Sequence, residues 1–172
     1  MLWTPLRFGK YEELPLPEVV LRDPNWFFWA YEKRSFGGGD LAREAGWVQR
    51  QARHIRLPLK APELHEVEYL FDPYGKLRHV TVVHAQRNRP ADPSSIFRKD
   101  IDLSIPHDIG KQDRYGGQVI MEFLKRFVFC DEGITLTTEI CEEFFDDDEN
   151  FDLGQTPSAP TKPKGLLFLN PI

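Results

Sequence analysis

Apolar positions recur at helical spacing through the first third of the chain. Residues 17–21 form an apolar run that begins with proline. Residues 23–33 begin with an Asp–Pro pair, which suits a helix start because Asp accepts hydrogen bonds from free N–H groups and Pro fits the first turn. The glycines at 37–39 end this helix. A further helix is predicted over residues 40–56, capped by Asp40. Its buried stripe consists of Leu41, Ala45, Val48, Ala52 and Ile55.

Strand patterns are few and short. A short strand is predicted at residues 6–8, before the helices. After the proline-containing linker at 57–62 the period changes to two, and residues 65–71 and 77–85 flank an Asp-Pro-Tyr-Gly turn, which predicts a β-hairpin. Residues 96–105 alternate apolar and polar side chains and are predicted to form a third strand.

The C-terminal third returns to helical spacing. Residues 115–130 form an amphipathic pattern with one apolar and one charged face, which predicts a long packing helix. A short strand is expected at 134–137. Thr138 is expected to cap a final helix. That helix carries the apolar residues Ile140, Phe144 and Phe145.

These patterns predict an α+β protein in three parts. Residues 1–57 form a small helical module, and residues 63–145 form a hairpin-based antiparallel sheet packed by one long helix. Residues 146–172 form an acidic, Pro-containing tail. The end of that tail, residues 165–172, is strongly apolar, so we expect it to dock on a protein surface.

Composition sets the class of protein. The chain has 172 residues, 41% of them hydrophobic and 28% charged, as in a globular protein in water. No apolar run is long enough to span a bilayer, and no secretory signal precedes the first helix, so we expect a cytoplasmic protein. Cys130 and Cys141 are the only cysteines, which excludes a disulfide framework and favours two reduced structural thiols.

Charge is unevenly distributed along the chain. Residues 1–60 hold 10 Lys and Arg against 7 Asp and Glu, whereas residues 131–172 hold 2 against 10. The predicted helix at 40–56 carries basic residues opposite its apolar stripe, and Lys10 adds a further cation. This set forms either a small phosphate-contacting face or the solvated side of an amphipathic helix. The candidate nucleic-acid contacts are Lys10, Arg43, Arg50, Arg53 and Arg56.

The acidic region has three possible interpretations. It is a solvated surface, a partner-binding surface that mimics phosphate spacing or covers a basic protein, or a divalent-cation site. EF-hand spacing is absent. The candidate partner-binding residues are Glu139, Glu142, Glu143, Asp146, Asp147, Asp148 and Glu149.

Catalytic patterns are weak. Asp100 and Asp102 share one face of the predicted third strand and are the best candidates for a metal-dependent hydrolase, but no E-x-K or D-x-K tripeptide follows. His107 and Asp108 are neighbours with the chemistry of an acid/base pair. We expect no catalytic residue, metal site or cofactor.

The N-terminal third carries one recognisable motif. It consists of Phe8-Gly9-Lys10-Tyr11, an apolar helix, and Asp23-Pro24 followed by Trp26 and Trp29. Over about residues 5–56 this pattern resembles the C-terminal module of exodeoxyribonuclease X-like nucleases and related short bacterial proteins. The resemblance implies an accessory role in nucleic-acid metabolism, with the motif aromatics as the module's core or one of them as a base-stacking platform.

The chain departs from that pattern directly after the tyrosine. The family places a basic residue, a glycine and often another basic residue there, whereas this chain has Glu12, Glu13 and Leu14. Two carboxylates would repel phosphate at this loop. We therefore expect any nucleic-acid contact to use the arginines of residues 40–56 instead.

Together these features predict a non-catalytic accessory protein of nucleic-acid metabolism that acts by binding a protein, with nucleic acid as a second possible partner and no membrane contact. One alternative is an acidic inhibitor or decoy of a basic nucleic-acid-handling protein. The other is a metal-dependent hydrolase. The sequence does not indicate an oligomeric state.

Overall fold

The computed structural model describes residues 2–86, 89, 92–110, 113 and 115–154, and it has the predicted α+β fold. Three helices come first: α1 (Leu16–Arg22), α2 (Pro24–Glu32) and α3 (Gly39–Ala52). A 3-10 turn, η1 (Pro62–Leu64), precedes the strands β1 (His65–Phe71), β2 (Leu77–His84) and β3 (Ser95–Arg98). The remaining elements are α4 (Ile105–Gly110), α5 (Gly116–Phe127), α6 (Thr138–Asp146) and η2 (Asp148–Asn150).

The three strands form one antiparallel sheet in the order β2-β1-β3. The predicted hairpin is confirmed: β1 pairs with β2, and Tyr69 lies opposite Val80. Tyr69 also pairs with Ile96 of β3 and is fully buried at the centre of the sheet. Helix α5 packs against β2, as the amphipathic pattern of residues 115–130 predicted.

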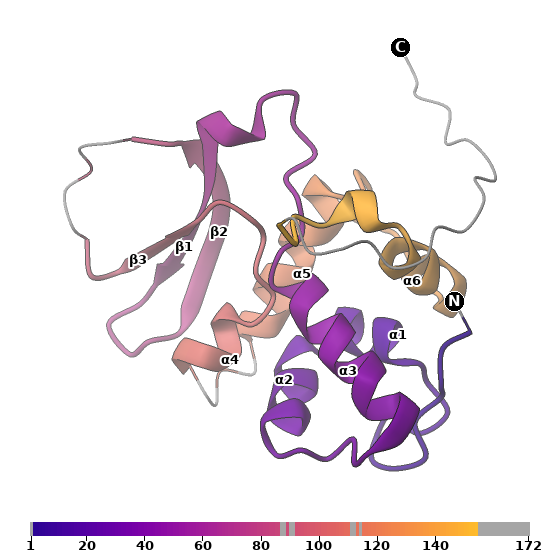
Figure 1. Cartoon of the computed structure of the whole chain (residues 1–172). Coiled ribbons are helices and arrows are strands. Elements are labelled where there is room, and N and C mark those ends of the chain that lie inside the picture. Colours follow the sequence, from indigo (N-terminus) through magenta and orange to yellow (C-terminus); the bar gives the residue numbers. More distant parts are fainter. Residues whose placement is uncertain (1, 87–88, 90–91, 111–112, 114, 155–172) are drawn as a thin grey trace.

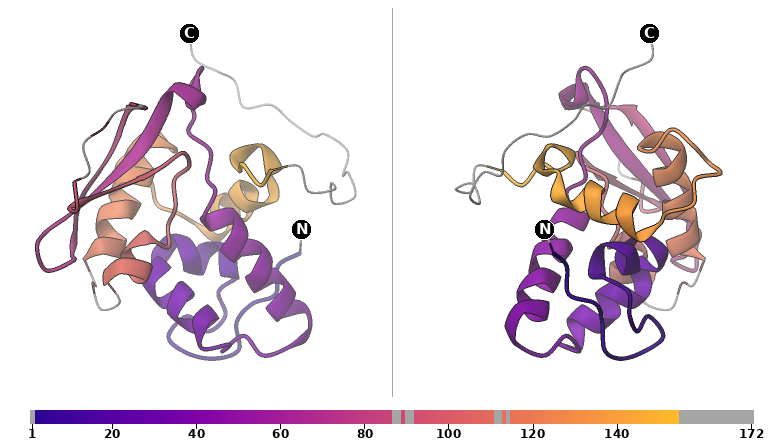
Figure 2. Two further views of the ribbon diagram at one scale, coloured as in Figure 1. Left: turned by 60° about the vertical axis from the view of Figure 1, so that its left-hand side comes forward. Right: turned by 90° about the vertical axis from the view of Figure 1, so that its right-hand side faces the viewer.

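The elements form layers (Figure 1). The two further views in Figure 2 place α4 and α5 between the sheet and the bundle of α1, α2 and α3. Helix α6 lies against α1, so the acidic end of the chain returns to the helical module. Gln51 of α3 donates a hydrogen bond to the carbonyl oxygen of Phe145 at 3.0 Å and is fully buried.

The FGKY motif forms a closed loop rather than the predicted strand at residues 6–8. Leu6 N–H donates to the carbonyl oxygen of Leu14 at 3.0 Å, and Glu13 N–H donates to the carbonyl oxygen of Leu6 at 2.9 Å. Gly9 has φ +76°, and a side chain there would meet the Trp26 ring at 3.1 Å. The loop is tight because it folds back over that ring.

The motif aromatics pack on one another, but they lie against the buried core and not within it, so the core interpretation is wrong in placing them there. Tyr11 lies edge-on to Trp26 with ring centroids 5.1 Å apart, and Phe8 lies 6.5 Å from the same ring. Trp29 is 47% exposed and is the most accessible of the four motif rings. The motif thus builds the surface layer of the helical module.

Tertiary pairing ends two predicted elements early. Helix α3 stops at Ala52 instead of continuing to residue 56, because the backbone of Ile55 exchanges two hydrogen bonds with Ile101. The third strand ends at Arg98, and Ile105 begins helix α4, which the sequence pattern did not predict. Asp102 accepts hydrogen bonds from the backbone and side chain of Ser104, the residue directly before this helix.

Two caps and one strand also differ from the prediction. Gly38 occupies the cap position of α3, and Asp40 lies in its first turn. Thr137 caps α6 by accepting from the N–H of Ile140, whereas Thr138 is the first helical residue and donates to buried Glu18. Residues 134–137 form no strand, and the edges of the described sheet are β2 and β3.

Residues 54–56 pair with two segments distant in sequence, one at Ile101 and one at residues 150–152. Ile55 bridges both Ile101 and Phe151, and Arg56 N–H donates to the carbonyl oxygen of Asn150 at 2.8 Å. Buried residues of the helical module, the sheet and α6 therefore belong to one core. The division into 1–57, 63–145 and 146–172 stays a prediction about modules. The apolar segment 165–172 lies outside the described residues.

Candidate interaction surfaces

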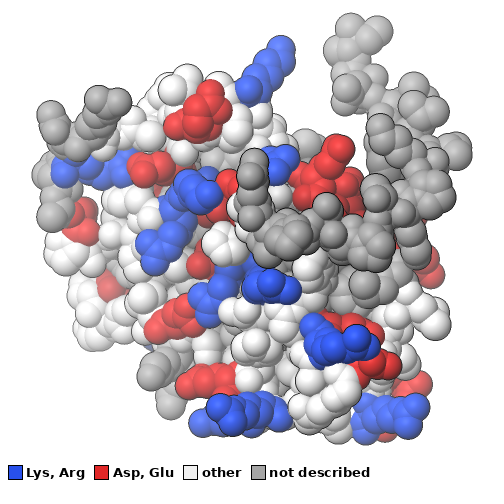
Figure 3. Space-filling view, viewed as in Figure 1, with Lys and Arg blue, Asp and Glu red and all other residues white. Residues whose placement is uncertain are grey.

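The predicted basic stripe is divided among several local contacts. Arg43 pairs with Asp40 one turn earlier on α3. Arg50 lies over the Trp47 ring, 5.2 Å from its centroid, and forms no ion pair with a described residue. Figure 3 shows Lys and Arg side chains on this face interspersed with Asp and Glu. The stripe is therefore not a continuous positive patch on that face.

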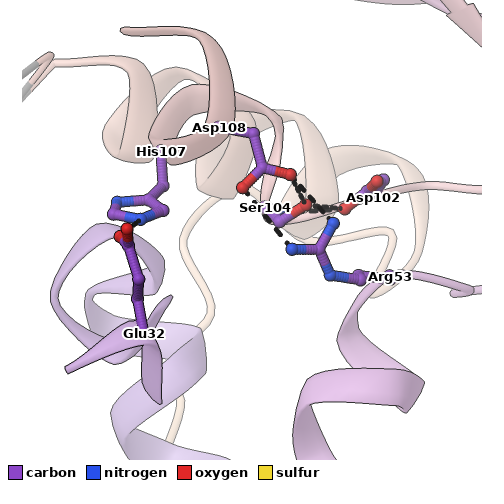
Figure 4. Close-up of polar contacts among 6 residues, drawn as sticks. All are labelled: Glu32, Arg53, Asp102, Ser104, His107 and Asp108. Carbon is purple, nitrogen blue, oxygen red and sulfur yellow. Dashed lines mark hydrogen bonds and ion pairs between the residues drawn. The ribbon is translucent and has the colours of Figure 1, made fainter. Parts of the chain in front are cut away.

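Arg53, at the end of α3, forms an ion pair with Asp108 of α4 (Figure 4). Its two terminal nitrogens lie 2.9 and 3.4 Å from the two carboxylate oxygens of Asp108. Its guanidinium also lies 5.2 Å from the centroid of the Phe28 ring. A bidentate pair of this kind fixes geometry as well as charge, so Arg53 holds two helices together.

Ser104 also contacts Asp108, and it contacts Asp102 as well. Its hydroxyl lies 2.6 Å from Asp102 Oδ1 and 3.1 Å from Asp108 Oδ2 (Figure 4). Ser104 is fully buried, so no substrate reaches its oxygen. Burial raises the pKa of Asp102, while the hydrogen bonds from Ser104 act against that rise. These hydrogen bonds link the residues that precede α4 to the helix itself. The buried Ser104 hydroxyl is not placed for nucleophilic attack on a substrate.

The other two predicted basic contacts, Arg56 and Lys10, also have partners within the protein. Arg56 donates to the carbonyl oxygen of Phe151 at 3.0 Å, close to the chain's acidic end. Lys10 Nζ lies 2.6 Å from Asp23 Oδ2, and the Tyr11 hydroxyl donates to the same oxygen at 2.9 Å. Partial burial alone would lower the pKa of Lys10, but its hydrogen bond to Asp23 raises it.

The acidic surface consists of the seven predicted carboxylates on α6 and η2. Six of them are exposed and Glu142 is half-buried, beyond the buried face made by Cys141, Phe144 and Phe145. Within the described part of the chain, six form no ion pair: Glu139, Glu142, Glu143, Asp147, Asp148 and Glu149.

The carboxylates of the acidic surface act on one another. Partial burial raises the pKa of Glu142, and the nearby Asp146 and Glu139 raise it further. Glu139 lies at the start of α6, where its own N–H and the Thr137 hydroxyl lower its pKa. The surface thus carries a concentration of negative charge that described cations do not neutralise.

The candidate catalytic residues do not converge. Asp100 lies 3.2 Å from His54 Nδ1, whereas Asp102 turns toward Ser104. Figure 4 shows His107 directed to Glu32 and Asp108 directed to Arg53, so the two neighbours are not an acid/base pair in this structure. Among the residues that are described, no group of three His, Cys, Asp or Glu side chains could hold a metal ion.

One feature escaped the sequence analysis: a cavity of about 460 Å³ between the end of α2 and the start of α3. Its only signal in the sequence is that α2 is followed by Lys33-Arg34-Ser35, with no glycine directly after the helix. The cavity is lined by Tyr31, Glu32, Arg34, Phe36, Gly37, Ala42 and Ala45.

No protein-family model matches this chain, and no curated protein and no solved structure matches it either. None of the described helices is long and apolar enough to cross a membrane.

Proposed function

We propose that this protein is a non-catalytic accessory protein of nucleic-acid metabolism, and that it binds a basic protein partner through the acidic surface of α6 and η2. The observation that carries the proposal is the contrast in charge compensation. Of the five predicted basic contacts, three form ion pairs and Arg56 contacts a backbone carbonyl, whereas six carboxylates of the acidic surface form no ion pair with described residues.

Uncompensated charge of one sign attracts the opposite charge and speeds diffusional encounter. The acidic surface keeps its carboxylates available because the apolar face of α6 is fixed in the core by Phe144 and Phe145. A rigid helix presents them in one arrangement, so a partner does not have to order them on binding. A basic protein surface fits this arrangement.

The nucleic-acid setting is supported by the N-terminal resemblance. In the family pattern a glycine occupies the position that Glu13 has in this chain. Glu13 has φ +71°, which lies in the left-handed region that favours glycine. The loop therefore has the backbone conformation that the family's glycine would suit, although the glycine itself has been replaced.

The acidic surface can be tested with a 20-residue Lys/Arg peptide, titrated calorimetrically at about 50 mM salt. The fourfold variant E142Q/E143Q/D148N/E149Q should bind the peptide about tenfold more weakly than the wild type, since each exposed charge pair contributes up to about 1 kcal/mol. Binding of the wild-type protein should weaken as salt increases.

The matched control removes four exposed carboxylates elsewhere: E12Q/E13Q/E63Q/E122Q. It has the same net charge as the surface variant and should retain most of the wild-type affinity. Equal weakening by the two variants would show that the peptide senses only total charge, and it would overturn the proposed surface. A photo-crosslinker at position 143, used in cells, should capture a basic nucleic-acid-handling protein; a partner of another class would overturn the setting.

A further inference from the structure

The end of α2 is built around a residue in a conformation that arginine rarely adopts. Arg34 N–H donates to the carbonyl oxygen of Tyr31 at 3.0 Å, and Ser35 N–H donates to that of Ala30 at 2.9 Å. These two bonds form a Schellman motif, whose left-handed position is usually glycine. Arg34 holds that position with φ +56°. Left-handed backbone is unfavourable for a residue that carries a Cβ atom.

Helix termination does not explain an arginine at this position, because glycine closes the same motif without that cost. The side chain of Arg34 lines the cavity between α2 and α3. It forms no ion pair with any described residue. Residues held in unfavourable backbone conformations are concentrated at ligand sites. The strained residue and the cavity therefore coincide.

The other residues that line the cavity are mostly aromatic or have small side chains. Tyr31 is 38% exposed, stacks on Phe27 with ring centroids 6.5 Å apart, and has its hydroxyl near Gly46 of α3. Phe36 is a buried lining residue, and the small side chains of Ala42 and Ala45 line the cavity from α3. The volume of about 460 Å³ lies in the range of roughly 300–1,000 Å³ for small-molecule sites.

Charges around the cavity favour an anion beside Arg34. The other charged lining residue, Glu32, lies 3.1 Å from His107 Nε2 and so has a partner outside the cavity. Asp40 in the first turn of α3 is paired with Arg43. Arg34 is thus the lining charge that has no partner among the described side chains.

We propose that this cavity binds one nucleoside phosphate, with the base stacked on Tyr31 and the phosphate on Arg34. Arginine's planar fork matches phosphate oxygens, and every base presents a face that stacks on an aromatic ring. The ligand is either a free mononucleotide or one unit of a single strand, which share this chemistry. The site is separate from the acidic surface, so E142Q/E143Q/D148N/E149Q leaves its affinity unchanged.

The test measures binding of AMP, dTMP and a fluorescent ten-residue oligo(dT) to the full chain at about 50 mM salt. Arg34→Gln should weaken binding about tenfold or more, since hydrogen bonds between charged groups are the strong ones. Lys76→Gln removes one exposed cation at the hairpin turn and should leave affinity unchanged. Tyr31→Leu should weaken binding about fivefold or more, and Tyr31→Phe should retain it.

Arg34→Gly separates the ligand role from a structural role. It relieves the left-handed backbone, so the melting temperature should equal or exceed that of the wild type while binding is lost. Glu13→Gly makes the same backbone change at φ +71° outside the cavity and should leave affinity unchanged.

Binding of oligo(dT) alone would identify the strand as the ligand, and equal binding of AMP or dTMP would identify free nucleotides; either result supports the site. Full affinity in Arg34→Gly, or no binding of any of the three probes to the wild-type protein, would overturn it.

Discussion

The basic stripe and the acidic surface are both amphipathic-helix faces with several charges of one sign, yet they differ in what those charges contact. On and near α3, Arg53 holds Asp108, and Arg43 holds Asp40. On α6 and η2, six carboxylates form no ion pair with the described residues. Four of the five predicted basic contacts have internal partners, whereas most carboxylates of the acidic surface have no ion pair with a described residue.

The net charge of a sequence segment therefore does not tell how many of its charged side chains are left for a partner to contact. An exposed ion pair adds little stability, but it does remove a cation from the set that a phosphate can contact without competition. Asp108 competes with any external anion for Arg53 at both terminal nitrogens. On the acidic surface six carboxylates have no ion pair with a described residue, so a basic partner meets less competition there.

The substitution with the largest expected effect tests whether the helical module and the C-terminal segment that carries the acidic surface fold independently. Ile55 is fully buried and bridges Ile101 and Phe151 between them. Ile55→Ala should lower the free energy of unfolding by about 2–5 kcal/mol, because it removes buried methyl groups and leaves a cavity. Leu64→Ala, at a position that is 52% exposed, should change stability by less than about 0.5 kcal/mol.

The four tryptophans all lie in the first 57 residues, so their fluorescence reports on the helical module, whereas far-ultraviolet circular dichroism reports on the whole fold. If the regions share one folding unit, both signals should follow the same urea transition in the wild type and in Ile55→Ala. A fluorescence transition separate from the dichroism transition would restore the view of independent modules.

Acid pH should act on the two regions with opposite signs. Burial would raise the pKa of Asp23, but hydrogen bonds from Lys10, the Trp26 N–H and Tyr11 hold it below the ordinary value of 3.8. Its stabilisation is present above that value and is lost as pH falls through the lowered pKa. Asn can still cap α2, so Asp23→Asn removes mainly the charge that Lys10 contacts; it should cost up to about 1 kcal/mol at pH 7, and the cost should fade in acid.

Glu142 has the opposite profile, because partial burial and its acidic neighbours raise its pKa above the ordinary value of 4.5. Ionised Glu142 weakens the fold at pH 7, so Glu142→Gln should be slightly more stable than the wild type there. That advantage should disappear below pH 4.5. Urea midpoints measured between pH 3 and 7 check both variants, and profiles of the same sign would contradict the contrast.

The smallest effect concerns stability after charge removal. Arg53→Gln should lower the free energy of unfolding by up to about 1 kcal/mol, and Arg43→Gln by less than about 0.5 kcal/mol. The variant E142Q/E143Q/D148N/E149Q should instead gain a few tenths of a kcal/mol at low salt, since like charges repel along α6. High salt should shrink all three changes. Destabilisation by the acidic-surface variant would show that its carboxylates make unrecognised internal contacts.

Local patterns predicted much of the fold. The hairpin of β1 and β2 follows from alternation on both sides of an Asp-Pro-Tyr-Gly turn, and α5 follows from a strong helical pattern. Helix α2 starts where Asp23 and Pro24 indicated, with Asp23 accepting from the Trp26 N–H at 3.0 Å. These elements are set by residues close in sequence, so a sequence pattern suffices.

The surfaces were predicted less completely. Spacing identified the residues of the basic stripe, but their partners lie far away in the chain: Arg53 meets Asp108, and Arg56 meets Phe151. The cavity at Arg34 has a lining drawn from two helices and the loop between them. The sequence indicates this cavity only through the absence of a glycine directly after α2. Whether the basic residues contact nucleic acid stays a prediction.

The sequence by itself determined the α+β class, the hairpin, the packing helix and the acidic character of the C-terminal end, because these depend on periodicity and composition within short windows. Only the tertiary structure decided where α3 ends, which charges are neutralised and where a cavity opens. Ile55 continues the helical stripe of α3, yet backbone pairing with Ile101 takes it out of the helix. Contacts between distant segments overrode local preference there, since each buried backbone group needs a partner.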